Sequence, residues 1–335
     1  MASDGLARAP GRQEGTRSAR AVLASAAVGH HHRNDAAGKL MDTDFRSEVA
    51  LEGLDLSSGE LASWITQLLA SGVHGLCFSA YLPGQSPEDH AQLSAEQIRD
   101  RLRIIAPHTR WIRTFSCSEG NELAPAIAHE LGLKTLVGAW LDADQERNER
   151  ELAKVVELAQ AGHCDLVAVG NEVLLRGELP EDAIIAAVER VKSAVPGVPV
   201  AYVDAYYLFA QHPRLVEACD YLPINCYPYW EGVPLEQSFG YVQRMVDMVV
   251  DCAHGKPVLI AETGWPTQGS PERGAVPGMD DAARYALNLI PWAERSSVPL
   301  FWFSAFDEAW KVGAEGDCGA YWGFWDAEGR PKYVR

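Results

Sequence analysis

The stretch DLVAVGNE at residues 165–172 is the best guide to the fold. Its apolar part, residues 166–169, has no polar face, as expected of a strand in a parallel sheet that helices cover on the outside. Asn171 and Glu172 follow it almost directly. The stretch therefore predicts a buried parallel strand that delivers polar side chains at its carboxyl end.

Seven further apolar runs of this kind alternate with amphipathic, helix-like stretches. The eight runs are residues 75–80, 110–115, 134–139, 165–170, 198–203, 221–226, 257–261 and 299–304. Their spacing leaves room for a strand, a loop, a helix and a second loop in each unit. An open doubly wound sheet would share this pattern. The count of eight, and polar residues that follow the strands, favour a closed (β/α)8 TIM barrel of the α/β class.

The helical stretches carry start signals of their own. Ser94 is expected to cap a helix that runs to Ile105, with Gln97 completing a capping box. The same apolar periodicity recurs at residues 183–195 and 280–294. Because no linker or composition shift interrupts the pattern, residues 46–335 are predicted to form one (β/α)8 catalytic domain.

Residues 1–45 differ from the rest of the chain. Four arginines are followed by small residues at 21–29 and by three histidines at 30–32. We interpret this segment as a disordered leader, with an export signal as the alternative. Adjacent histidines on such a segment lack the rigid scaffold of a metal site, so neither a metal nor a cofactor is predicted.

The composition narrows the class of partner. Of 335 residues, 46 are acidic and 29 basic, which gives a net charge of -17. Such a surface repels nucleic acid and anionic lipid, and no apolar run is long enough to span a bilayer. Ten Trp and eleven Tyr suit a neutral, ring-shaped substrate such as a sugar. We expect a monomeric enzyme that acts on a carbohydrate.

The seven cysteines are dispersed and odd in number. They lack the close spacing of zinc or redox sites, which favours reduced thiols. A periplasmic enzyme can also carry buried free cysteines. The localisation stays open, although a polysaccharide substrate would suit a periplasmic or secreted enzyme.

In a barrel of this kind, the reacting groups gather at the carboxyl ends of the strands. Carboxylates and aromatic residues are frequent at these ends. The candidate substrate-binding residues are Tyr81, Arg113, Asn171, Asp204, Tyr206, Tyr227, Tyr229, Trp230, Trp265, Phe306, Glu308 and Lys311. Glu119, Asn121, Trp140, Tyr207, Asn225 and Trp310 lie at the same ends.

Two of these carboxylates stand out, Glu172 after the fourth strand and Glu262 after the seventh. Each directly or closely follows a buried apolar run, where an idle carboxylate would be costly. Cleavage of a glycosidic bond needs one protonated and one ionised carboxyl group on opposite sides of the sugar. The two strands lie across a narrow barrel, so the side chains can converge to the ~5 Å separation of a retaining mechanism. We predict Glu172 as acid/base and Glu262 as nucleophile.

The sequence also resembles glycoside hydrolase family 17, the β-1,3-glucanase family. The matching segments are Ser79-Ala80-Tyr81 with Gly84-Gln85-Ser86-Pro87, Ile112-Arg113-Thr114-Phe115, Val137-Gly138-Ala139-Trp140-Leu141, Val169-Gly170-Asn171-Glu172-Val173, Ala261-Glu262-Thr263-Gly264-Trp265-Pro266 and Phe306-Asp307-Glu308-Ala309-Trp310-Lys311. They span residues 75–333, nearly the whole barrel. The short loops after the fifth and sixth strands resemble the compact bacterial or fungal branch rather than the long plant enzymes.

The resemblance implies roles for individual residues. Glu172 would be the proton donor and later base, and Glu262 would form the glycosyl-enzyme intermediate. Asn171 would hold the sugar 2-hydroxyl, and Tyr227 would hydrogen-bond the nucleophile.

Other residues keep two interpretations. Glu308 and Lys311 match a third carboxylate and a lysine of the family, which could shape the sugar site or form a plain surface pair. Trp230 and Trp265 are candidate stacking platforms, although Trp265 beside Pro266 could simply pack the loop. Tyr229 and Trp230 would favour transfer if they bind an acceptor sugar.

Several alternatives stay open. The compact branch includes hydrolases as well as glucanosyltransferases that form β-1,6 branches or elongate β-1,3 chains, and the sequence does not divide them. A non-catalytic carbohydrate-binding barrel is a rival from another class. A metal-dependent hydrolase barrel would need histidines at strand ends, and a phosphate-binding barrel would need a glycine-rich cradle; neither pattern is found.

Overall fold

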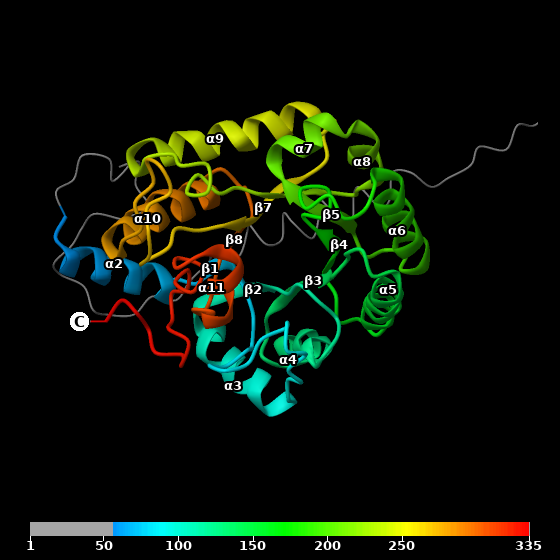
Figure 1. The fold of residues 1–335 in the computed structure, drawn as a ribbon, viewed down its shortest axis with the longest axis horizontal. Helices are drawn as coiled ribbons and strands as arrows, with labels where there is room; N and C mark the ends of the chain where they lie inside the picture. The colour runs from blue at the N-terminus through cyan, green and yellow to red at the C-terminus, as the bar shows by residue number, and fades with distance from the viewer. Residues whose placement is uncertain (1–55, 335) are drawn as a thin grey trace, which may run out of the picture.

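The computed structural model describes residues 56–334 and shows a closed barrel of eight parallel strands in the order β1 to β8 (Figure 1). The strands are β1 Val73–Cys77, β2 Thr109–Arg113, β3 Lys134–Ala139, β4 Leu166–Asn171, β5 Val200–Ala205, β6 Leu222–Asn225, β7 Val258–Thr263 and β8 Leu300–Trp302. All eight overlap the predicted runs, so the predicted (β/α)8 fold is confirmed. The expectations for residues 1–45 lie outside the described residues.

Helices surround the barrel on its outer side (Figure 1). They are α2 Ser58–Ala70, α3 Ala95–Ile105, α4 Ala124–Glu130, α5 Gln145–Gln160, α6 Glu181–Ala194, α7 Tyr206–Gln211, α8 Pro213–Ala218, α9 Leu235–Cys252, α10 Met279–Arg295 and α11 Val312–Glu315, with 3-10 turns η1 Ala106–His108, η2 Asn121–Leu123 and η3 Ala309–Lys311. The eighth unit departs from the simple repeat. Only η3 and the four-residue α11 follow β8, and α2, which precedes β1, packs against α10 instead.

The predicted cap of α3 is half confirmed. The Ser94 hydroxyl accepts a hydrogen bond from the Gln97 backbone N–H at 3.1 Å. The capping box is wrong, because the Gln97 side chain donates to the Ala80 carbonyl oxygen at 2.8 Å and to Gln85. Gln97 therefore ties the start of α3 to the loop after β1.

The strands are buried on both faces, as their apolar runs predicted. The large side chains of Trp111, Tyr202 and Trp302 are almost wholly enclosed. All seven cysteines lie in the described range and are free thiols. Burial raises the pKa of Cys77 to about 12, which keeps this thiol, close to the strand ends, protonated.

Irregular pairing occurs at the carboxyl ends of three strand pairs. The register shifts between Ala168 and Asn171 in β4, between Ile224 and Asn225 in β6, and after Ile260 in β7. Such irregularities re-aim the side chains that follow them. Asn225 pairs with Glu262 across the β6–β7 ladder, so the fold itself brings these two residues side by side.

The close approach of β7 and β8 gives a stability prediction. A Cβ added at Gly264 would lie 2.1 Å from the carbonyl oxygen of Phe303. We expect Gly264→Ala to lower the free energy of unfolding by about 1–3 kcal/mol or more, because backbone would have to move. The matched control is Gly59→Ala in α2, where nothing lies within 4 Å. It should stay within about 1 kcal/mol of the parent protein in urea unfolding. Equal stabilities for the two variants would contradict this packing argument.

Candidate active site

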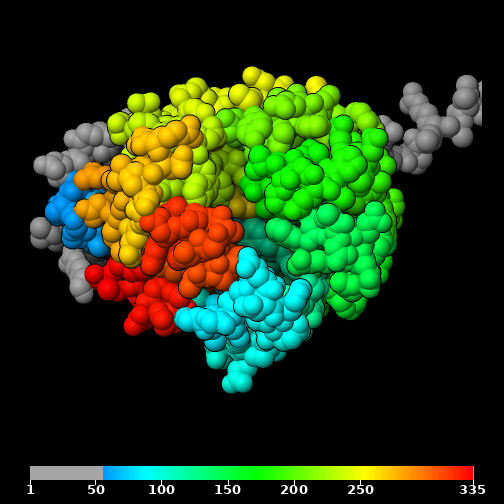
Figure 2. Space-filling view, in the orientation of Figure 1, coloured from blue at the N-terminus to red at the C-terminus, as the bar shows by residue number. Residues whose placement is uncertain are grey.

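A cavity of about 730 Å³ opens at the carboxyl ends of the strands. Figure 2 shows the molecule hollowed at the centre of this face, between the cyan, green and orange-red segments. Nine of the predicted site residues line it: Tyr81, Asn171, Glu172, Tyr206, Tyr227, Trp230, Glu262, Glu308 and Lys311. The volume is in the range of small-molecule sites, and the lining mixes aromatic rings with carboxyl groups.

Glu172 lies directly after β4 on an unusual backbone. Its φ is 54°, in the left-handed region that non-glycine residues rarely adopt, and Gly170 just before it has φ 80°. Its N–H bonds the Val203 carbonyl at 2.9 Å, which fixes the turn to β5. Backbone strain of this kind persists where the surrounding structure over-determines a functional side chain. The turn carries the Glu172 carboxyl group into the cavity.

Glu262 lies within β7, one residue before its end, whereas the sequence placed it just beyond the strand. Only 6% of its surface is exposed. Its Oε1 accepts from Arg113 Nη1 at 2.5 Å and from Asn225 Nδ2 at 3.1 Å, and its Oε2 accepts from the Tyr227 hydroxyl at 2.7 Å. Burial and the charge of Glu262 raise the pKa of Tyr227, so the phenol stays a donor. Three donors thus stabilise an ionised Glu262.

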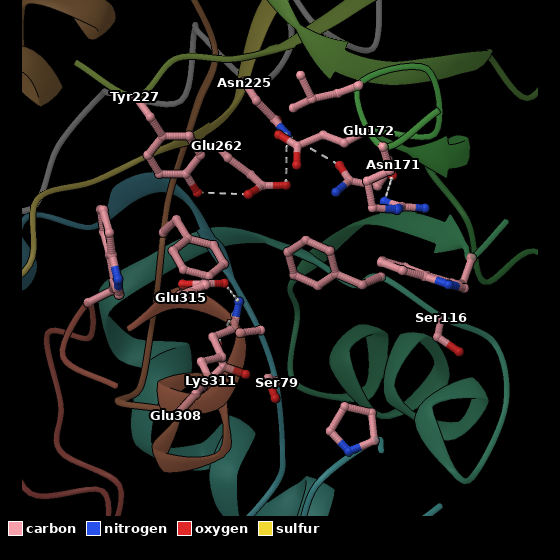
Figure 3. Close-up of a pocket in the computed structure, with 18 of the residues that line it drawn as sticks. Ser79, Ser116, Asn171, Glu172, Asn225, Tyr227, Glu262, Glu308, Lys311 and Glu315 are labelled. Carbon is pink, nitrogen blue, oxygen red and sulfur yellow. Dashed lines mark hydrogen bonds and ion pairs between the residues drawn. The ribbon is translucent and has the colours of Figure 1, made fainter. Parts of the chain in front are cut away.

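The two carboxyl groups face each other across Asn225 (Figure 3). Asn225 Nδ2 donates to Glu172 Oε1 at 2.8 Å and to Glu262 Oε1 at 3.1 Å. Because the two hydrogen bonds, of 2.8 Å and 3.1 Å, share the nitrogen Nδ2, Glu172 Oε1 and Glu262 Oε1 can be at most 5.9 Å apart. Retaining glycosidases separate their carboxyl groups by about 5–5.5 Å, and inverting ones by about 6.5–9.5 Å. The spacing fits retention.

The environments of the two glutamates differ. Burial, and next the negative charge of Glu262, raise the pKa of Glu172 to about 7. The hydrogen bond from Asn225 and the charge of Arg113 act in the opposite direction. At neutral pH and below, Glu172 can therefore hold the proton that acid-assisted bond cleavage needs, beside the Glu262 carboxyl group that accepts three hydrogen bonds.

A second ionic cluster lies on the opposite wall of the cavity (Figure 3). Lys311 Nζ is 3.8 Å from Glu308 Oε2 and 3.1 Å from Glu315 Oε1, and it lies 4.3 Å from the centre of the Phe303 ring. Burial lowers the pKa of Lys311, but the charges of Glu308 and Glu315 more than offset this and raise it. The side chains of Glu308 and Lys311 are only 7% and 13% exposed, so they are not a plain surface pair.

Four predicted substrate-binding residues lie away from the cavity. Asp204 is fully buried and accepts from the Tyr202 hydroxyl and the Ala205 N–H. Tyr229 donates to the Ser270 carbonyl at 2.6 Å, and Trp265 to the Val276 carbonyl at 2.8 Å.

The fourth residue is Phe306. The centre of its ring lies 3.5 Å from Cζ of the Arg101 guanidinium group. These four residues pack the walls and loops behind the cavity, so the prediction that they bind substrate is corrected. Trp265 packs the loop, as its alternative interpretation had it. Arg113 lies below the cavity and acts on it through Glu262 and Asn171, whose Oδ1 it bonds at 2.7 Å.

The cavity also has lining residues outside the predicted substrate-binding set. They are Phe78, Ser79, Pro87, Glu88, Phe115, Ser116, Glu119, Asn121, Trp140, Arg147, Leu175, Arg176, Ala205, Tyr207, Asn225, Glu231, Phe303, Trp310, Ala314, Glu315 and Trp322. Those at strand ends, Asn225 above all, had a signal in the sequence because a polar residue closes an apolar run. Glu315 and Trp322 had none, since no periodic pattern leads from β8 into the C-terminal segment.

Residues 56–334 lack two kinds of feature. No helix there is both long and apolar enough to cross a membrane. In the same range, no group of three or more His, Cys, Asp or Glu side chains is arranged to hold a metal ion.

A closed barrel with two carboxyl groups facing each other at the ends of β4 and β7 is typical of retaining glycosidases. The family described as "BtgE/BtgC glycoside hydrolase domain" matches residues 75–323. The chain belongs to this family, within glycoside hydrolase family 17. Its relatives named below are fungal, so the resemblance lies with the fungal branch of the compact enzymes.

Individual relatives agree with this placement. A glucan 1,3-beta-glucosidase of Arthroderma benhamiae is 27% identical over 290 residues, which cover 79% of this chain and 91% of that protein. The cell surface mannoprotein MP65 of Candida albicans is 31% identical over 269 residues, 76% of this chain and 67% of that protein. The crystal structure of a glycoside hydrolase family 17 beta-1,3-glucanosyltransferase from Rhizomucor miehei matches 79% of this chain and 98% of its own, with 26% identity and a TM-score of 0.71.

Proposed function

We propose that this chain is a retaining enzyme that acts on β-1,3-glucan, with Glu172 as the general acid and base and Glu262 as the nucleophile. The observation that carries the proposal is the spacing of the two carboxyl groups, at most 5.9 Å between the oxygens that Asn225 joins through bonds of 2.8 Å and 3.1 Å. The named relatives support the substrate, since their names contain glucan 1,3-beta-glucosidase and beta-1,3-glucanosyltransferase.

The reaction follows from the two environments. Glu172 gives its proton to the glycosidic oxygen as that bond breaks, while a Glu262 oxygen bonds to the anomeric carbon. Until that moment, Arg113 and Tyr227 hold the Glu262 carboxyl group in place through hydrogen bonds to its two oxygens. Glu172, now a carboxylate, then removes a proton from the incoming hydroxyl group, which displaces Glu262 and restores both residues. Two displacements leave the configuration of the anomeric carbon unchanged.

The incoming hydroxyl group can belong to water or to a second sugar, so hydrolysis and transfer share the same intermediate. We propose that both are open to this site, since Tyr206, Tyr207 and Trp230 line the cavity as apolar faces on which an acceptor sugar could stack. The test is mass spectrometry of the products from laminaripentaose. Products that are only shorter identify a hydrolase, and products longer than the input identify a transferase. An unchanged pentaose would contradict the proposed substrate.

The raised pKa of Glu172 predicts the pH dependence. Glu172 must be protonated to act as the acid. On the alkaline side of the optimum, kcat/KM should therefore fall as the pH rises through the Glu172 pKa of about 7, about tenfold per pH unit. Initial rates on laminaripentaose between about pH 4 and 9 would measure this alkaline limb of the pH profile. As a control, Glu172→Gln on a substrate with a dinitrophenyl leaving group should lack the limb. An alkaline limb with its midpoint below about pH 5 would contradict the role of burial at Glu172.

We further propose that residues 46–335 contain the whole catalytic domain and act as a monomer, since the described residues that line the cavity all lie between Phe78 and Trp322. A chain without the first 45 residues should keep kcat and KM within about twofold of the full chain if this proposal holds. Its mass by light scattering should be that of one chain. Loss of activity with an intact fold, or a stable dimer, would contradict this proposal.

A further inference from the structure

Asn225, the last residue of β6, lies between the two candidate catalytic carboxyl groups (Figure 3). It is 3% exposed. Its Nδ2 has three acceptors within hydrogen-bonding distance: Glu172 Oε1 at 2.8 Å, Glu262 Oε1 at 3.1 Å and Asn171 Oδ1 at 3.3 Å. A primary amide has two N–H groups, so Asn225 can give one to each glutamate.

The orientation of this amide follows from its surroundings. All three neighbours of Nδ2 are acceptors, whereas the buried Oδ1 receives no hydrogen bond from the described residues. A flipped amide would place Oδ1 against two carboxyl groups, take the amide donor from Glu172 Oε1, and leave Glu262 Oε1 with the bond from Arg113 alone. Asn225 is therefore held as a donor, although its own Oδ1 then accepts no hydrogen bond from the described residues.

The position matters because the two carboxyl groups repel each other whenever both are ionised. At this short separation and away from bulk water, the repulsion favours side-chain conformations that spread the pair. The hydrogen bonds from Arg113 and Tyr227 go to Glu262 and not to Glu172. A donor placed between the pair attracts both carboxylates and opposes the spreading.

We propose that Asn225 is a positioning residue of the reaction, whose amide holds Glu172 and Glu262 at the separation that retention needs and fixes which oxygen of each takes part. This inference rests on the proposed function. Asn225 engages Oε1 of both glutamates, so the transferable proton of Glu172 belongs on Oε2. On Glu262, Oε1 also accepts from the Arg113 cation, so Oε2, bonded only by the neutral Tyr227 hydroxyl, is the better nucleophile.

The role can be read from the titration of Glu172. The charged groups that face Glu172 are Glu262 and Asp204, which raise its pKa, and Arg113, which lowers it. Replacing only Asn225 changes none of these three charged residues. Because the Asn225 bond favours the ionised form of Glu172, its removal should raise the pKa of Glu172 further.

The experiment is a carbon-13 NMR titration of the glutamate carboxyl groups, with the Glu172 signal assigned by its loss in Glu172→Gln. In Asn225→Ala the midpoint for Glu172 should rise by about one pH unit, as expected for a lost hydrogen bond to a carboxylate. In Asn225→Asp, which has the same size, it should rise at least as far. The matched control is Asn121→Ala, since Asn121 lines the same cavity but bonds Tyr81 and Ser118 instead of the glutamates. Its Glu172 midpoint should not move.

Kinetics add a readout that a purely structural role would not give. On laminaripentaose, Asn225→Ala should lower kcat by about 100-fold with little change in KM, and its alkaline limb should move to higher pH together with the NMR midpoint. An unchanged Glu172 midpoint in both Asn225 variants would overturn the inference, even if activity were lost. Because the titration needs no turnover, it decides the role of Asn225 separately from the substrate assay. A parent protein that does not turn over laminaripentaose would contradict only the proposed function.

Discussion

Glu262→Gln is expected to lower kcat/KM on laminaripentaose by about 10⁵-fold, the scale of loss when a covalent nucleophile is removed. Glutamine has nearly the same shape and can still accept from Tyr227, but its amide cannot form the glycosyl ester. The carboxyl group that Asn225 joins to Glu262 is that of Glu172, which already has the role of acid and base. Steady-state rates at the pH optimum would measure the loss.

The control for this variant concerns folding. A neutral glutamine at this position would leave the Arg113 charge without its carboxylate partner, which can destabilise the barrel. The melting temperature and the binding of laminaritriose should therefore be measured beside the rates. A folded, ligand-binding variant that kept more than about a tenth of the parent activity would contradict the assignment of Glu262.

Glu172→Ala should show a loss that depends on the leaving group. On laminaripentaose, kcat/KM should fall about 10²–10⁴-fold, because no proton reaches the departing oxygen. With a dinitrophenyl β-laminaribioside, whose leaving group needs no proton, bond cleavage should stay fast and the glycosyl-enzyme should accumulate. Stopped-flow release of dinitrophenol would show a burst followed by slow turnover.

Azide provides the matching rescue. It needs no general base, so it should enter the space left by the Glu172 side chain, release the stalled intermediate and give a β-glycosyl azide. Nuclear magnetic resonance would identify the product and its anomeric configuration. An equal loss on both substrates, with no effect of azide, would mean that Glu172 supports the site without transferring a proton.

The parts of the fold that could be predicted are those with a local signal. Apolar runs such as residues 166–169 specify buried strands, and their carboxyl ends, with Asn171 and Glu172, must meet on one face of a closed barrel. The spacing of Glu172 and Glu262 followed from barrel geometry alone. By contrast, the missing eighth helix depends on how α2 packs against α10, a contact between distant segments that no local pattern encodes.

Two of the four misplaced side chains share one physical cause. Tyr229 and Trp265 stand at strand ends, but both have a polar group that finds a backbone carbonyl in the long loop before α10, and this turns their rings into the wall. An aromatic residue at a strand end can face either way, and burial decides which. Asn225 was visible in the sequence as a polar strand end. Its contact with both glutamates needed the register of β6 against β7.

The most direct test of the central claim is to trap the intermediate with 2-fluoro-laminaribiosyl fluoride, which forms the glycosyl-enzyme quickly and hydrolyses slowly. Intact-mass spectrometry, followed by peptide mapping, would locate the label. We predict the addition of one fluoro-sugar per chain, on the peptide that contains Glu262, and none in Glu262→Gln. A parent protein that turns over laminaripentaose but carries no label, or carries it on another residue, would contradict a retaining mechanism through Glu262.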